Sequence, residues 1–275
     1  MKQILKTELK RAMRGKGMLL SILIGSIVGI AHIIQYIIIP AYQANLTHFY
    51  ENFPILSPNS SLETWIAGSP LNLEGFIFFL ILPILACLPL GTSYFDDRDS
   101  GFIKNIYMRT DRKKYLMAKY ISAFFSGGIA VIIPLLLNLI CSLVMLPNLL
   151  PISTMGQNGI TPLMLFYKLF FSYPMIYTML FLFIDFLMAG IWSCVGLAAS
   201  FLSDYKIIVL IFPFFVQLIF HVICTILNQI GYSSVYWMQP GYGITEWWIP
   251  VLYLMAGVIV TLLVFMKKGE NEDVF

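Results

Sequence analysis

Six long apolar runs, separated by short polar stretches, dominate the chain. A helix needs roughly 20 mostly apolar residues to cross a bilayer core about 30 Å thick, and each run is close to or above that length. The predicted membrane spans are residues 18–40, 75–95, 120–146, 173–201, 207–230 and 248–266. Too few residues lie between them to build a soluble domain. The pattern therefore predicts one all-α membrane domain over residues 1–275.

The composition agrees with a membrane protein and removes several classes of function. Hydrophobic residues make up 59% of the 275 positions, charged residues make up 11%, and the mean hydropathy of +0.83 lies outside the soluble range. The cysteines all fall inside predicted spans without C-x-x-C spacing, so we expect them to pack as small apolar side chains. They are Cys87, Cys141, Cys194 and Cys224. No metal site is expected, and the basic residues need no nucleic-acid partner to explain them.

Lysine and arginine are distributed very unevenly between the two sides of the predicted spans. Sixteen of the seventeen lie on one side, and only Lys168 lies on the other. Because short cytoplasmic loops retain positive residues, we expect both termini and the loop 96–119 to face the cytoplasm of a plasma or inner membrane. The basic rim suits the anionic headgroups of membrane lipids.

Residues 1–17 repeat apolar positions at helical spacing, with Leu5 and Leu9 on one face and Lys6 and Lys10 on another. This amphipathic pattern is typical of a helix that lies in the membrane interface with its apolar side toward the lipid. The competing interpretation is a frayed basic tail that only obeys the charge rule.

The loop 96–119 holds eleven of the chain's thirty-one charged residues, together with an unexpected apolar pattern. Gly101 supplies a break, and two residue pairs spaced i, i+4 then place two apolar ridges on one short helix. The pairs are Phe102 with Ile106 and Ile103 with Tyr107. A short apolar helix among charges predicts a docking surface for another protein. The alternative is that the ridges pack against the end of the protein's own bundle.

Both flanks of this loop resemble a known family. The opening carries acidic, arginine, acidic and glycine residues at Asp97, Arg98, Asp99 and Gly101. The close carries a basic residue, a Tyr-Leu pair and a final lysine at Arg112, Tyr115, Leu116 and Lys119. This order of residues resembles the cytoplasmic loop of the type-2 ABC exporter permeases. The basic amphipathic start and the six spans resemble the overall layout of the same family.

That resemblance implies a permease subunit without its own ATPase, and no G-x-x-x-x-G-K-[ST] phosphate loop occurs in the sequence. A separate ABC ATPase subunit would bind ATP and magnesium, and two permeases, identical or related, would pair. Neither a catalytic residue nor a cofactor is implied for this chain. The residues implied to dock onto the ATPase are Asp97, Gly101, Phe102, Ile103, Lys104, Ile106, Tyr107 and Arg109. The cargo would be hydrophobic or amphipathic, such as a drug, an antimicrobial peptide or a lipid-like molecule.

Asp185 lies near the middle of the fourth predicted span, where a charged side chain costs about 2.5–3.5 kcal/mol. We expect it to face a partner helix or a water-filled cavity. The candidate partners are His32, His221, Asn138 and Gln217. Asp185 then marks either a cargo or proton site or a structural polar contact, between helices or between two permeases.

Three other functions stay open on the residues alone. A secondary transporter would use Asp185 and His221 as a proton relay. An intramembrane hydrolase would recruit Ser193, Ser200 and His221, although neither a G-x-S-x-G nor an H-E-x-x-H motif is present. A purely structural membrane subunit would need no site.

Overall fold

The protein is a bundle of helices, and every regular element in the described ranges is helical. The computed structural model describes residues 2–52, 59–68, 72–151, 164–240 and 246–272. The residues outside the description include 53–58 and 69–71 between the first two predicted spans, 152–163 between the third and fourth, and 241–245 between the fifth and sixth.

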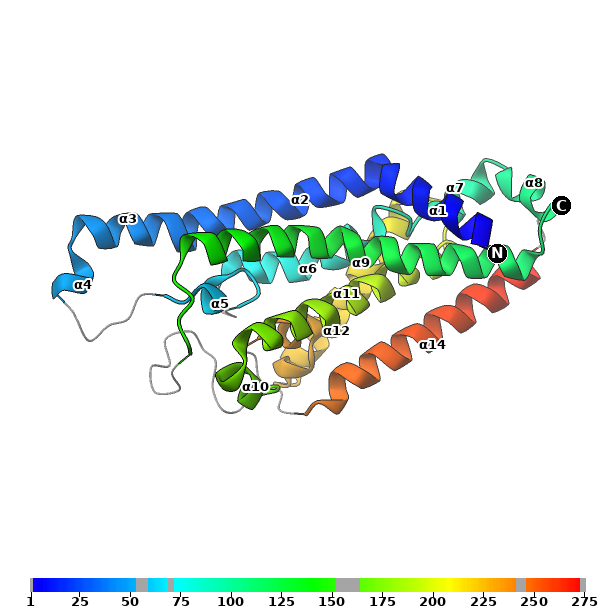
Figure 1. Ribbon diagram of the computed structural model, residues 1–275. Coiled ribbons are helices and arrows are strands. Elements are labelled where there is room, and N and C mark those ends of the chain that lie inside the picture. The colour runs from blue at the N-terminus through cyan, green and yellow to red at the C-terminus, as the bar shows by residue number, and fades with distance from the viewer. Residues whose placement is uncertain (1, 53–58, 69–71, 152–163, 241–245, 273–275) are drawn as a thin grey trace.

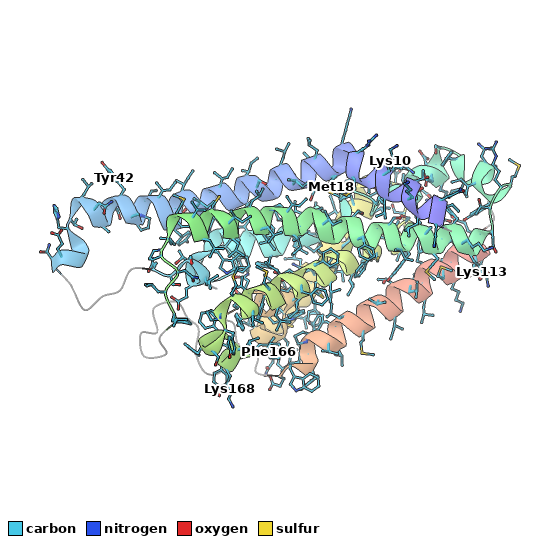
Figure 2. All side chains as sticks on the ribbon, viewed as in Figure 1. Lys10, Met18, Tyr42, Lys113, Phe166 and Lys168 are labelled. Carbon is cyan, nitrogen blue, oxygen red and sulfur yellow. The ribbon has the colours of Figure 1, made fainter. Side chains whose placement is uncertain are left out.

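The long helices run side by side in an elongated bundle (Figure 1). α1 (Lys2–Arg14) and the last turns of α14 (Trp248–Asn271) lie at the same end of it. Figure 2 places Lys10 and Lys113 toward that end and Lys168 toward the opposite one. The uneven charge of the sequence is therefore an asymmetry along the bundle axis. We call the end that carries α1 the basic end.

Within the described ranges five helices are long and apolar enough to cross a membrane, so this part of the chain has the structure of a helical, multi-pass membrane protein. They are Lys16–Leu46, Arg112–Met145 (α9), Pro174–Ala199 (α11), Lys206–Ile226 (α12) and Trp248–Asn271 (α14). The first comprises α2 (Lys16–Ile33), a π-helical turn (Ile34–Ile38) and α3 (Ile39–Leu46). The shortest elements are α4 (Phe49–Asn52), α5 (Ser61–Thr64), α10 (Tyr167–Ser172), a 3-10 turn (Ile230–Tyr232) and α13 (Ser234–Trp237).

The second predicted span, 75–95, is divided between two helices. α6 spans Leu73–Cys87 and α7 spans Ser93–Asp99. At about 1.5 Å per residue, the 15 residues of α6 extend only about 22 Å, which is short of a bilayer core. Pro89, which has no N–H to donate, and Gly91 lie in the interruption. The second predicted span would be the sixth membrane crossing beside the five long helices, and it stays a prediction.

α11 is the central helix of the bundle, since 72% of its apolar window is buried, against 22% for α12 and α14. It approaches α9 closely through small residues. A Cβ atom added to Gly127 of α9 would lie 2.5 Å from the Cβ atom of Ser193. One added to Gly128 would lie 2.5 Å from the ring of Phe186. Small residues thus let the two backbones come together, as is common between membrane helices.

α1 forms over the predicted residues and packs against α9. Its buried residues are Glu8 and Ala12, so it meets the bundle through a carboxylate as well as an apolar contact. Lys6 and Lys10 are exposed. The predicted position of α1 in the lipid interface stays a prediction.

Candidate docking site

Ser100 and Gly101 join α7 to α8 (Phe102–Tyr107), and Gly101 makes the break that the sequence predicts. Gly101 adopts φ 68° and ψ 6°, the left-handed conformation that residues with a side chain avoid. A Cβ atom added there would meet nothing within 4 Å, so the backbone conformation, not space, selects glycine. The turn places α8 at the extreme basic end of the bundle (Figure 1).

One of the two predicted ridges of α8 is held by the protein itself. Ile103 is fully buried, at 0% exposed, in a cluster that includes Tyr115 and Leu116 of α9. The rings of Tyr107 and Tyr115 pack edge to face with centroids 5.9 Å apart. Ile106 is half-buried against the same cluster. The interpretation that the ridges pack against the protein's own bundle therefore holds for Ile103.

The rest of α8 is exposed and mixes apolar with basic side chains. Phe102 is 47% exposed, and Met108, which caps the helix, is 71% exposed. Lys104, Asn105 and Arg109 are also exposed. Sequence reasoning missed Met108, although its position one turn after Lys104 could have indicated it. We define the α8 surface as Phe102, Lys104, Asn105, Met108 and Arg109.

A cleft of about 300 Å³ separates α8 from α1. Ile4 and Thr7 line it from α1, and Phe102 and Ile106 line it from α8. Phe102 is thus one wall of a recess and not an isolated apolar side chain on a flat face.

Asp97, which was expected to dock, lies buried behind α8 and is paired inside the chain. Its carboxylate accepts hydrogen bonds from Arg11 Nη1 at 2.7 Å and Tyr115 Oη at 2.6 Å, and it forms an ion pair with Lys119. Lys119 is fully buried and also pairs with Glu8 Oε2 at 2.9 Å. Burial alone would raise the pKa of Asp97, but the charge of Lys119 and these hydrogen bonds hold it below its usual value. This ion network ties α7 to α1 and α9.

The neighbouring charges of α7 bind other helices. Asp96 pairs with Lys206 of α12 at 2.7 Å. Arg98 pairs with Glu272, which follows α14, at 3.2 Å and with Asp204 at 3.3 Å. Successive side chains on a helix point in different directions, so Asp96, Asp97 and Arg98 each meet a different part of the chain. These three charges thus have a structural reason within the chain.

Sequence reasoning gave Glu8 no role and placed Lys119 only in the family motif, although each carried a signal of the ion network. Glu8 is the single acidic residue of α1. Lys119 lies four residues after Tyr115, where the apolar part of α9 begins. Neither signal identifies a partner, because the pairing depends on how α1 packs on α9.

Asp185 is fully buried in α11, and neither of its carboxylate oxygens has a hydrogen-bond partner among the described residues. The predicted partners are engaged elsewhere, so that prediction is wrong. His221 Nδ1 lies 2.9 Å from Ser233 Oγ, and Gln217 Nε2 donates to the backbone oxygen of Phe79 at 2.8 Å. The structure therefore does not bring Asp185 and His221 together as a proton relay.

His32 and Asn138 instead hold the other end of the bundle together. Asn138 Oδ1 accepts a hydrogen bond from the Ile66 N–H at 2.8 Å. Its amide nitrogen then donates to Gly29 O at 2.9 Å and faces His32 Nδ1 at 3.3 Å. The other ring nitrogen, His32 Nε2, lies 2.8 Å from the side-chain amide nitrogen of Asn72, within hydrogen-bond distance. Both residues have a structural role, since they fasten a connecting segment onto α2 and α9.

The other chemistry considered from the sequence is not assembled in the described ranges. Ser200 Oγ, at the end of α11, donates to the Gly196 carbonyl, and Ser193 Oγ is buried with no hydrogen-bond partner among the residues that the structure describes. No group of three or more His, Cys, Asp or Glu side chains that could hold a metal ion occurs in that part of the chain. The four cysteines are free thiols.

A scan against protein-family models found no match, and searches of curated proteins and of solved structures found none either. The fold and the site therefore define a class of protein but no family. The chain is a multi-pass helical membrane protein that presents a short, partly apolar helix at its basic end.

Proposed function

We propose that this protein is the membrane-spanning permease subunit of an ABC exporter. A separate ATPase subunit, which binds ATP and magnesium, docks onto the α8 surface from the cytoplasm. The permease then moves a hydrophobic or amphipathic cargo outward, such as a drug, an antimicrobial peptide or a lipid-like molecule. A second permease, identical or related, completes the transporter. In this proposal α6 and α7 supply the sixth crossing, and the basic end faces the cytoplasm.

The observation that carries the proposal is the arrangement of α8. Ile103 anchors the helix to the bundle, while Phe102 and Met108 stay exposed. Two large apolar side chains on a short helix among charges are typical of a protein-binding surface. Lys104 and Arg109 beside them would set the register and the choice of partner. A soluble protein with an apolar groove and an acidic rim fits this surface.

The ion network behind α8 supports a role in transmitting movement. Asp97 connects α7 to Arg11 of α1 and to Lys119 of α9. A displacement of α8 would therefore be carried into two further helices and not absorbed in a loop. α9 in turn packs on the central helix α11. Closure of an ATP-bound partner would thus bias the whole bundle between two arrangements.

Copurification tests this proposal. The tagged full chain is purified in mild detergent from the membranes of its own cells, and bound ATPase activity and an accompanying subunit with a phosphate-binding loop are measured. Phe102→Asp should remove both, because docking would desolvate the new carboxylate. Tyr205→Asp, which changes another exposed aromatic residue beside the basic end of α12, should leave both unchanged. The proposal fails if the unmodified protein carries no ATPase, or if ATPase is retained after Phe102→Asp combined with Ile106→Asp.

A proton-coupled secondary transporter is the second candidate, and the buried, unpartnered Asp185 is the observation in its favour. Such a carrier needs no ATPase. The protein alone in liposomes would then move a hydrophobic cationic dye under a pH gradient, and Asp185→Asn would abolish that movement. Dye transport that requires an added ATPase would exclude this candidate.

A further inference from the structure

A cavity of about 630 Å³ lies at the basic end of the bundle beside the last turns of α14. The residues that line it are Phe201, Val264, Lys267, Lys268, Asn271 and Glu272. The cavity shares no residue with the α8 surface, so its role does not depend on the proposed ATPase.

Two lysines give this cavity a positive charge that the described residues do not neutralise. Lys267 and Lys268 are exposed, and no ion pair joins either of them to a residue in the described ranges. Glu272 is already bound, since its carboxylate accepts a hydrogen bond from Tyr94 Oη at 2.6 Å and pairs with Arg98 at 3.2 Å. The lysines are therefore available to an anion from outside the chain.

An apolar strip leads along α14 to these lysines. Val264 lies one helical turn before Lys268, and Val260 lies one turn before Val264, so the three share a face of the helix. Both valines are exposed, and Phe201 adds an aromatic wall. An apolar strip that ends in unpaired cations matches a phospholipid, with an acyl chain along the valines and the phosphate at the lysines.

We propose that this cavity binds one anionic phospholipid from the leaflet that meets the basic end of the bundle. The phosphate accepts charge-assisted hydrogen bonds from Lys267 and Lys268, and the side-chain amide of Asn271 donates to the headgroup. The lipid fills the space between the end of α14 and Phe201, which follows α11. It therefore braces a helix whose apolar window is only 22% buried by the protein itself.

The test measures lipid binding to the full chain in mixed micelles of phosphatidylglycerol or phosphatidylcholine, from the rise in unfolding temperature over a lipid titration. The unmodified protein should bind phosphatidylglycerol more tightly. Lys267→Gln with Lys268→Gln should weaken that affinity roughly 30-fold, because each lysine near an anionic surface contributes about a factor of five. Lys267→Arg with Lys268→Arg should retain it, because phosphate accepts hydrogen bonds from either side chain.

Lys6→Gln with Lys10→Gln is the matched control, since it removes two exposed lysines from α1 at the same end. This control should weaken the phosphatidylglycerol affinity far less, because Lys6 and Lys10 do not line the cavity, and an equal loss in both glutamine pairs would overturn the site in favour of a general basic rim. Val264→Trp fills the apolar strip and should weaken lipid binding with all charges in place. Inorganic phosphate should stabilise the protein far less than the lipid does. Equal stabilisation by the two, or full lipid affinity in Val264→Trp, would overturn the assignment to a lipid.

Discussion

Lys119→Met is the sharpest perturbation of the ion network behind α8. Lys119 is fully buried between Glu8 and Asp97, and methionine keeps most of its length while removing its charge. Two buried carboxylates would then lie close together without the cation that neutralises them. Removing one partner of a buried ion pair costs about 3–5 kcal/mol. Asp97 keeps its hydrogen bonds from Arg11 and Tyr115, so we expect the lower end, about 3 kcal/mol.

The assay is equilibrium unfolding of the purified chain in mixed micelles, followed by helical circular dichroism over a denaturant titration. A loss of about 3 kcal/mol corresponds to a roughly 150-fold change in the unfolding equilibrium constant. The matched control is Lys114→Met, which removes an exposed lysine that pairs with Asp111 at 3.8 Å. That change should cost about 0–1 kcal/mol, as is usual for surface ion pairs. An unfolding free energy in Lys119→Met equal to that of the control would refute the reasoning.

The same network predicts how stability depends on pH. Burial opposes ionisation of Asp97, but the charge of Lys119 outweighs burial, so the pKa of Asp97 lies below its usual value. In the unfolded chain the pKa of an Asp side chain is about 3.9. As the pH falls below that value the unfolded chain takes up a proton first, so this contribution to stability is lost as the pH falls through the folded pKa. The unfolding free energy between pH 7 and pH 3 should therefore fall less steeply in Lys119→Met, and parallel curves would contradict the ion pair.

Three further predictions concern single positions. Gly101→Ala should lower the free energy of unfolding by about 1 kcal/mol, because φ of 68° disfavours a Cβ atom. Gly101→Asn should lower the free energy of unfolding by less, and equal stability of both variants and the unmodified protein would contradict the left-handed turn. Gly127→Leu should abolish the yield of monodisperse protein on gel filtration, because even a Cβ atom would lie 2.5 Å from Ser193. Asp185→Asn should preserve or raise folded yield, because a neutral amide costs less than a carboxylate in an apolar core. Normal cargo transport by that variant would remove Asp185 from any functional site, and a collapse of its yield would reveal a partner for the carboxylate.

Local patterns in the sequence determined most of the architecture. Long apolar runs, the segregation of lysine and arginine, and Gly101 before a short apolar pattern are signals that need no knowledge of packing. The helical membrane class, the break at Gly101 and the existence of α8 therefore agree with the structure. The division of the second span carried a signal in Pro89, but its outcome depends on packing. A Cβ atom added to Gly17 of α2 would clash with the carbonyl oxygen of Leu88, so another helix is pressed against the interruption.

Only the tertiary structure decided which polar groups meet. Asp97 binds Arg11, 86 residues earlier, and Lys119, 22 residues later, and no periodic pattern connects positions so far apart. The partners expected for Asp185 had suitable chemistry, yet they bind elsewhere because the rotation of each helix about its axis decides what its side chains face. Close contacts such as that of Gly127 with α11 set this rotation. The sequence by itself therefore determined which segments are helices, and packing determined which of their faces meet.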